Sequence, residues 1–222
     1  MNKSDAPSTS TATVTKKNKR APNRESIVTV GATKWLQLKT IDYTDEDGVI
    51  RKWDVATRTT KEVDVPDAVV IVPIMKSKKN NIFETLIVEQ YRPPLEKYAL
   101  EFPAGLIDHG ETAQIAALRE LKEETGYIGT IETKFRSDEL CMSPGFSDET
   151  IQIVVVNIDL DDPRNKNPKQ ELDSGEAVVV KRVPLSLALK DALGKSESMP
   201  ISMLYSFALG LEIGAKYFTS DA

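Results

Sequence analysis

Cysteine and histidine are almost absent from this sequence of 222 residues, which contains only Cys141 and His109. A single cysteine excludes an intramolecular disulfide and favours a reducing compartment. A single histidine excludes a histidine-rich metal site and an acid/base pair of two histidines. The chain also lacks any apolar run near the ~18 residues of a membrane-spanning helix. We therefore expect no membrane partner.

Acidic residues outnumber basic ones outside the first residues of the chain. Residues 1–26 contain six Lys/Arg and two Asp/Glu, a balance of +4, whereas the whole chain carries −5. The remaining residues therefore carry −9, and this acidic balance argues against nucleic acid as a partner. An anionic substrate would need local neutralisation in such a body, and a divalent cation is the usual means.

Residues 1–26 are rich in Ser, Thr, Lys and Pro and poor in aliphatic side chains. They cannot bury enough apolar surface to offset their ordering entropy, so we expect a disordered basic tail. Its composition faintly resembles a mitochondrial transit peptide, but Asp5, Glu25 and two prolines would interrupt an amphipathic helix. We expect a cytoplasmic protein, with the nucleus as a second location and mitochondria least favoured.

The pattern of apolar residues predicts strands and helices in mixed order. Residues 27–64 contain short alternating runs with Asp47-Gly48 as a hairpin turn, which predicts a small N-terminal β-subdomain. Further strands are expected within 68–75, 82–92, 98–105, 151–160 and 177–183, and helices at 112–125, near 185–193 and at 201–217. Without strict βαβ alternation, the fold class is α/β (α+β), a mixed sheet with a helix packed on each face.

The helix predicted over 112–125 carries three glutamates close to its C-terminal end. Ile115, Leu118 and Leu121 mark its expected buried face, and Gly126 its end. Glu120, Glu123 and Glu124 stand at i, i+3 and i+4, so their carboxylates repel one another and oppose the helix dipole. A solvated acidic face with an Arg119–Glu123 ion pair is one interpretation. A bound divalent cation is the other, because Mg²⁺ takes carboxylate oxygens together with substrate phosphates.

The spacing around these glutamates is a complete motif. Gly105, Glu111, Arg119-Glu120-Leu121, Glu123-Glu124 and Gly126-Tyr127 match GX5EX7REUXEEXGU, the Nudix box, where U is a bulky apolar residue. The chain thus resembles the Nudix hydrolases. EQYRPPLEKYALEFPAGLIDHGET, CMSPGFSDETI and SGEAVVV further resemble the eukaryotic ADP-ribose (ADP-sugar) pyrophosphatases, as does Pro144 beyond the box. The resemblance implies a Nudix fold, an α/β/α sandwich, with residues 27–64 serving dimerisation and adenine binding and residues 65–222 forming the hydrolase domain.

The resemblance also implies metal-site roles. Mg²⁺, which Mn²⁺ can replace, would be held by Glu120, Glu124 and the carbonyl of Ala104, with Glu123 alongside. Arg119 would orient a glutamate by hydrogen bonding. Glu176 corresponds to a family glutamate that reaches the metal site on loop closure, as a ligand and candidate general base. Glu171 and Asp173 lie close to it in the sequence, and the box glutamates compete for the role of base.

Substrate contacts implied by the resemblance lie in both regions of the chain. Related enzymes stack adenine between two tryptophans across a swapped homodimer, which here would be Trp35 and Trp53; the alternative is that both pack in the subdomain core. Arginines suit phosphate pairing. The remaining candidates are Arg58, Arg92, Asp54, Leu106 and Ser143, the last standing where some relatives have an acidic residue.

The expected reaction is hydrolysis of ADP-ribose, and of other ADP-sugars, to AMP and ribose 5-phosphate. One alternative is a Nudix hydrolase acting on an oxidised nucleoside diphosphate or another dinucleotide. Another is a sensor that binds ADP-ribose without hydrolysing it. Retention of every box carboxylate favours an enzyme over the sensor.

Overall fold

The computed structural model describes residues 21–79 and 82–218 of the chain. These residues fall into two compact units, one ending at Thr59 and the other starting at Thr60. The sequence-based boundary, after residue 64, lies slightly further along the chain. Residues 60–64 go with the second unit because Lys61 binds Asp67 at 2.8 Å and Glu62 contacts His109 at 2.6 Å.

The first unit is an antiparallel sheet of β1 (Asn23–Ala32), β2 (Leu36–Thr44) and β3 (Ile50–Arg58). β1 begins inside the segment predicted as a tail, because Asn23 pairs with Thr44 and Ser26 with Asp42. The prediction was therefore wrong for residues 23–26, and residues 1–20 lie outside the described part. The hairpin turn before β3 is confirmed: the Asp45 carboxylate accepts the N–H groups of Asp47 and Val49.

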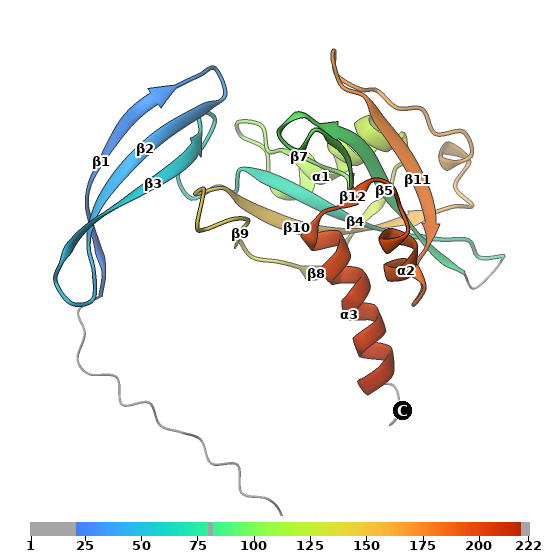
Figure 1. Ribbon diagram of the computed structural model, residues 1–222. Helices are drawn as coiled ribbons and strands as arrows, with labels where there is room; N and C mark the ends of the chain where they lie inside the picture. The colour runs from blue at the N-terminus through green and yellow to red at the C-terminus, as the bar shows by residue number, and fades with distance from the viewer. Residues whose placement is uncertain (1–20, 80–81, 219–222) are drawn as a thin grey trace, which may run out of the picture. The chain divides into compact units, whose positions relative to one another are not determined.

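The second unit is built on a mixed sheet (Figure 1). β4 pairs with β10 in parallel and with β7 and the end of β5 in antiparallel fashion. β5 in turn pairs with β6 and β11. The strands are β4 (Ala68–Lys76), β5 (Phe83–Arg92), β6 (Lys97–Glu101), β7 (Ala104–Leu106), β8 (Thr130–Arg136), β9 (Leu140–Cys141), β10 (Thr150–Asp159), β11 (Val178–Pro184) and β12 (Met199–Pro200). Two 3₁₀ turns, η1 (Pro93–Leu95) and η2 (Pro163–Asn165), complete the connections.

Helices cover both faces of this sheet, which confirms the α/β/α sandwich (Figure 1). α1 (Ala113–Thr125) packs on one face, and α2 (Leu189–Gly194) and α3 (Ser202–Phe218) pack on the other. α2 starts later than predicted because Leu185 still follows the sheet, donating its N–H to the carbonyl of Phe83. Within the described ranges, no helix is both long and apolar enough to span a membrane.

The buried face of α1 differs from the predicted one. Leu121 is buried as expected, but Ile115 is 56% exposed and Leu118 is also exposed. Alanines at 113, 116 and 117 face the core instead. Their short side chains let the helix axis lie close to β4 and β7, and this proximity brings the glutamates of α1 to the sheet.

Candidate functional site

The last turns of α1 hold the glutamates against strand β7. Thr112 begins the helix by accepting the N–H of Ile115, and Gly126 ends it in the left-handed region at φ 74°. The carboxylate of Glu124 accepts the backbone N–H of Ala104 at 3.0 Å. The hydrogen bond between Ala104 and Glu124 is thus donated by the N–H of Ala104, whereas the resemblance implied a role for its carbonyl.

Gly105 allows Glu120 to lie directly over the backbone of β7. A Cβ atom at position 105 would stand 1.9–2.3 Å from the carboxylate atoms of Glu120, closer than side chains approach one another. The absence of a side chain at Gly105 is thus what permits this close approach. Any larger residue here would displace the carboxylate.

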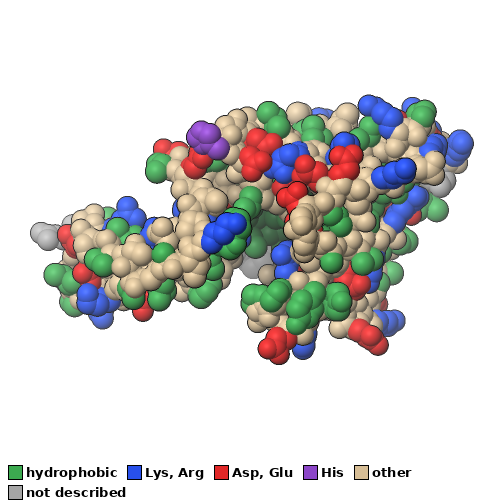
Figure 2. Space-filling model, turned by 90° about the horizontal axis from the view of Figure 1, so that it is seen from above, with side chains coloured by type: hydrophobic (Ala, Val, Ile, Leu, Met, Phe, Trp, Pro, Cys, Tyr) green, Lys and Arg blue, Asp and Glu red, His purple; other side chains and the backbone are tan. Residues whose placement is uncertain are grey.

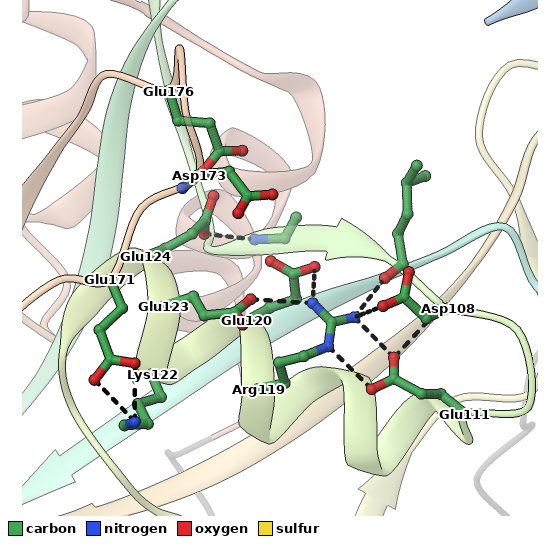
Figure 3. A network of polar contacts seen from close by, with 12 residues as sticks. Asp108, Glu111, Arg119, Glu120, Lys122, Glu123, Glu124, Glu171, Asp173 and Glu176 are labelled. Carbon is green, nitrogen blue, oxygen red and sulfur yellow. Dashed lines mark hydrogen bonds and ion pairs between the residues drawn. The ribbon is translucent and has the colours of Figure 1, made fainter.

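Arg119 is the centre of the polar network beside these glutamates (Figure 3). Its guanidinium donates to both carboxylate oxygens of Glu111, at 2.9 and 2.7 Å, and to the carbonyl of Leu106 at 3.0 Å. The same group contacts Glu120 at 2.7 Å and Glu123 at 3.1 Å. Hydrogen bonding to Glu111 is the largest cause that raises the pKa of Arg119, and the same bond lowers the pKa of Glu111. Arg119 therefore fixes the orientation of three glutamates, Glu111, Glu120 and Glu123.

Glu124 and Glu120 are carboxyl groups in an environment that disfavours their charge. Burial is the main cause that raises the pKa of Glu124 to about 8, against the hydrogen bond from Ala104. Charge repulsion from Glu120 and Glu176 adds to the effect. Burial likewise raises the pKa of Glu120, opposed by its bond to Arg119. The protein therefore supplies too little positive charge around Glu124 to keep this carboxyl group ionised at neutral pH.

Arg92, one of the predicted substrate residues, lies on β5 and is held by Glu101 on β6. Its guanidinium makes two bonds to the Glu101 carboxylate, at 2.6 and 2.9 Å. This pairing is the largest cause that raises the pKa of Arg92, and Glu124 and Glu176 add to it through their charge. Sequence reasoning missed Glu101, although a charged residue within the apolar run YALEF was a usable signal.

Glu176 lies on the loop between η2 and β11, on the same side of the sheet as α1. Figure 3 shows Glu176 and Asp173 beside Glu124, whereas Glu171 points to Lys122 at the outer side of the helix. The structure separates Glu171 from the other two acidic residues. Glu176 and Asp173 face the glutamates of α1, and Glu171 does not.

A divalent cation fits the donor chemistry of this site. Within residues 21–79 and 82–218, no three Asp, Glu, His or Cys side chains are already gathered as a metal cage. Mg²⁺ does not require one, because it is commonly bound by one or two carboxylates with water and substrate phosphates. Glu120 and Glu124 supply such carboxylates, and because burial raises the pKa of both, a bound cation would favour their charged form.

The surface around the site is mixed in charge. Figure 2 shows Asp and Glu side chains gathered beside Lys and Arg side chains on one face of the larger unit. Ser143 lies in an exposed turn, where its carbonyl accepts the N–H groups of Phe146 and Ser147. Leu106 ends β7 and contacts Arg119 through its backbone, so its side chain is not fixed by that bond.

Four predicted substrate residues belong to the first unit. Trp53 and Asp54 are consecutive on β3 and therefore point to opposite faces of the sheet. Trp53 pairs with Ile41 and is 46% exposed, while Asp54 accepts the hydroxyl of Thr40 at 2.6 Å. Trp35 is exposed in the β1–β2 connection, with Lys34 over its ring, and Arg58 ends β3. Neither tryptophan is part of a buried core.

Comparison with known proteins agrees with this geometry. A family model described as NUDIX domain matches residues 65–201. An ADP-sugar pyrophosphatase from Mus musculus is 37% identical over 191 residues, 85% of this chain and 85% of that protein. An ADP-ribose pyrophosphatase from Saccharomyces cerevisiae is 43% identical over 145 residues, 65% of this chain and 62% of that protein.

A solved structure shares the fold. The crystal structure of an ADP compounds hydrolase matches with a TM-score of 0.62 at 22% identity, covering 90% of this chain and 98% of that chain. Together with the complete motif from Gly105 to Tyr127, the domain match and the relatives show that this chain belongs to the Nudix hydrolase family.

Proposed function

We propose that this protein hydrolyses the diphosphate of ADP-ribose to AMP and ribose 5-phosphate in a reaction that depends on Mg²⁺, which Mn²⁺ can replace. The buried carboxylate of Glu124 beside Glu120 carries the proposal. Nudix hydrolases generally use divalent metal ions. The names of the relatives, pyrophosphatases of ADP-sugars and of ADP-ribose, support the substrate class.

Residues of this chain would divide the work of hydrolysis. A bound divalent ion would neutralise the diphosphate and polarise its oxygens. Glu120, Glu124 and Glu176 would hold the ion, together with the backbone of Ala104. Arg119 keeps Glu120 in place, and Arg92 offers a guanidinium that Glu101 has already oriented toward the same region.

The proton of the attacking water needs an acceptor. Glu176 is one candidate, because it stands on an exposed loop that faces the glutamates of α1 (Figure 3). Glu120, Glu123 and Glu124 are the others. A general base must come within hydrogen-bonding reach of the water in the substrate complex, so positions in the free protein do not exclude any of them.

The first unit would bind adenine and form a homodimer. Trp35 and Trp53 expose their rings, as a stacking role requires. Stacking on an aromatic side chain contributes about 1–3 kcal/mol per base. Arg58 and Asp54 of the first unit would contact the nucleotide, and Leu106 and Ser143 are the further substrate-contact candidates in the second unit.

A turnover screen tests the proposal. ADP-ribose, ADP-glucose, diadenosine polyphosphates, NADH and 8-oxo nucleotides would each be incubated with Mg²⁺ and with EDTA, and the products identified by chromatography. We expect ADP-ribose to give the highest kcat/KM, with AMP and ribose 5-phosphate as products and no turnover in EDTA. Glu124→Gln should lower kcat at least ~100-fold, as loss of a metal ligand or base would.

Three outcomes would overturn the proposal. Faster turnover of an oxidised nucleotide or a dinucleotide would assign the enzyme to that substrate instead. Binding of ADP-ribose without any hydrolysis would make the protein a sensor. Near-normal rates in Glu124→Gln would place the chemistry elsewhere.

A further inference from the structure

The side chain of Gln170 ties the loop that carries Glu176 to the end of helix α1. Its Nε2 atom donates one hydrogen bond to the carbonyl of Glu124 at 2.6 Å and another to the carbonyl of Val178 at 2.9 Å. One amide nitrogen carries two hydrogens, so both bonds form at once. Gln170 thus connects a glutamate of the site, by its backbone, with the first residue of β11.

The residues around Gln170 dock onto the same helix end. The N–H of Glu171 donates to the carbonyl of Glu123 at 2.8 Å, and Lys122 binds the Glu171 carboxylate at 2.9 Å. Gly126 is so close to Lys169 that a Cβ atom would stand 2.3–2.7 Å from its backbone. The last carbonyls of a helix have no partner within the helix, and here the loop supplies partners for two of them.

Residues 171–177 lie in the chain between Gln170 and Val178, whose carbonyl accepts one of the Gln170 bonds. They form the part of the loop that bears Glu176. These residues form a local turn. The N–H of Asp173 donates to the Glu176 carboxylate at 3.2 Å, and the N–H of Glu176 donates to the carbonyl of Asp173 at 3.0 Å, with Gly175 at φ 93°. Residues from Asp173 to Ala177 are exposed. The position of Glu176 therefore depends on how the base of this loop is held.

Packing is incomplete at that base. A hollow of about 270 Å³ lies next to Gln170, lined also by Leu86, Thr125, Tyr127, Pro168, Val180 and Arg182. A loop that borders an open hollow gains few of the close contacts that fix side chains in a core. The hydrogen bonds of Gln170 then join those of Glu171 in holding the loop, and those of Gln170 alone also reach the start of β11.

We propose that Gln170 is a positioning residue, whose bridge between the carbonyls of Glu124 and Val178 sets the loop so that Glu176 faces Glu120 and Glu124. The proposal rests on the proposed function for its kinetic consequence. Its structural consequence, the order of the loop, does not depend on the reaction.

Gln170→Met tests the bridge, because methionine keeps the length of the side chain and removes both donors. Gln152→Met is the matched control: Gln152 on β10 makes one such bond, to the carbonyl of Ser137 at 2.7 Å, away from this loop. With ADP-ribose and Mg²⁺, we expect Gln170→Met to lower kcat about 3- to 10-fold, the effect of losing one or two ordinary hydrogen bonds. KM and the thermal midpoint should change no more than in the control.

A double-mutant cycle with Glu176→Gln shows whether Gln170 acts through Glu176. If it does, adding Gln170→Met to Glu176→Gln should change kcat less than 2-fold, because coupled residues are not additive. Full additivity of the two effects would overturn the proposal, as would a Gln170→Met variant with the kcat of the control.

Hydrogen exchange separates this proposal from the proposed function. In Gln170→Met, the amides of Glu171 and Glu176 should exchange at least ~5-fold faster than in the wild type, while the amide of Leu121 within α1 is unchanged. If the wild type had no hydrolase activity and Gln170→Met still showed this faster exchange, the bridge would be supported and the proposed function refuted. Unchanged exchange at both amides would refute the bridge itself.

Discussion

Glu124 is a carboxyl group buried beside other acidic side chains. It is 7% exposed, and its pKa is raised to about 8 mainly by burial and further by Glu120 and Glu176. Burying a carboxylate that lacks a full counter-charge costs free energy. A residue that opposes stability in this way is typical of a functional site, where binding of a ligand offsets the cost.

We predict that Glu124→Gln stabilises the metal-free protein, and increasingly so from about pH 4.5 to pH 8. The unfolded chain loses the Glu124 proton near 4.5, whereas the folded protein keeps it to about 8. The folded state therefore binds more protons in this window, so the free energy of unfolding falls as pH rises. The free energy of unfolding changes by a few kcal/mol at most, because each pKa unit corresponds to ~1.4 kcal/mol. Glutamine does not titrate and can still accept the N–H of Ala104.

Urea unfolding in EDTA at pH 5 and pH 8.5 measures this difference. Glu139→Gln, at an exposed position between β8 and β9, is the control and should follow the wild type at both pH values. A Glu124→Gln variant with the pH dependence of the wild type would show that Glu124 is not held in its neutral form.

Helix α1 is the element that joins the motif to the rest of the site. Its start at Thr112 and its end at Gly126 were predictable, because a threonine cap and a C-terminal glycine are local signals. Its buried face was not. Alanines pack there because β4 and β7 lie close, and the partner of a helix cannot be read from periodicity within the helix.

Gly126 should be more sensitive to substitution than Gly110. Both have positive φ, 74° and 80°, so alanine at either position costs about 1 kcal/mol or more of backbone strain. At Gly126 the added Cβ also meets the backbone of Lys169, whereas at Gly110 nothing lies within 4 Å. We predict a loss of ~1 kcal/mol for Gly110→Ala and at least ~2 kcal/mol for Gly126→Ala.

Chemical unfolding followed by circular dichroism gives both values. Equal losses of stability in the two variants would mean that the backbone at Lys169 moves away from the added Cβ atom at little cost. That result would contradict the close docking of this loop on α1.

Contacts between elements account for what the sequence could not predict at the site. The motif identified Glu120 and Glu124 because its spacing lies within one helix. Glu101 and Gln170 are joined to the site by pairs that cross between elements, to Arg92 and to the carbonyl of Glu124. The charge of Glu101 within an apolar run is a local signal, but without the strand register or the loop path the sequence does not show which residue Glu101 or Gln170 contacts.

At the scale of the whole molecule, the first unit exposes apolar side chains on both faces of a three-stranded sheet. Val28 is 60% exposed and Trp53 46%, and neighbours in the sheet such as Leu36, Leu38 and Ile50 are exposed as well. Small sheets gain stability from apolar cover, and contiguous exposed apolar surface marks contact sites. The pattern of strands predicted this unit from the sequence. It did not predict that apolar side chains are exposed on both faces, because alternation within a strand does not show what covers either face.

We predict that the protein sediments as a homodimer of the 24.6 kDa chain through this unit. Val28→Lys should shift the equilibrium toward monomer, because a charge would be buried in the contact. Phe135→Lys, a substitution at a similarly exposed apolar residue of β8 in the second unit, is the control and should remain dimeric. A monomeric wild type, or a dimer insensitive to Val28→Lys, would contradict the role given to the first unit.

Calorimetric titration of Mg²⁺ tests the central claim that Glu120 and Glu124 bind a divalent cation. The titration would use protein saturated with a non-hydrolysable methylene analogue of ADP-ribose, with Glu139→Gln as the charge-matched control. We predict Mg²⁺ binding in the wild type and the control, and at least ~10-fold weaker binding in Glu124→Gln. Equal affinity in all three proteins, or no Mg²⁺ binding in the wild type, would contradict the account.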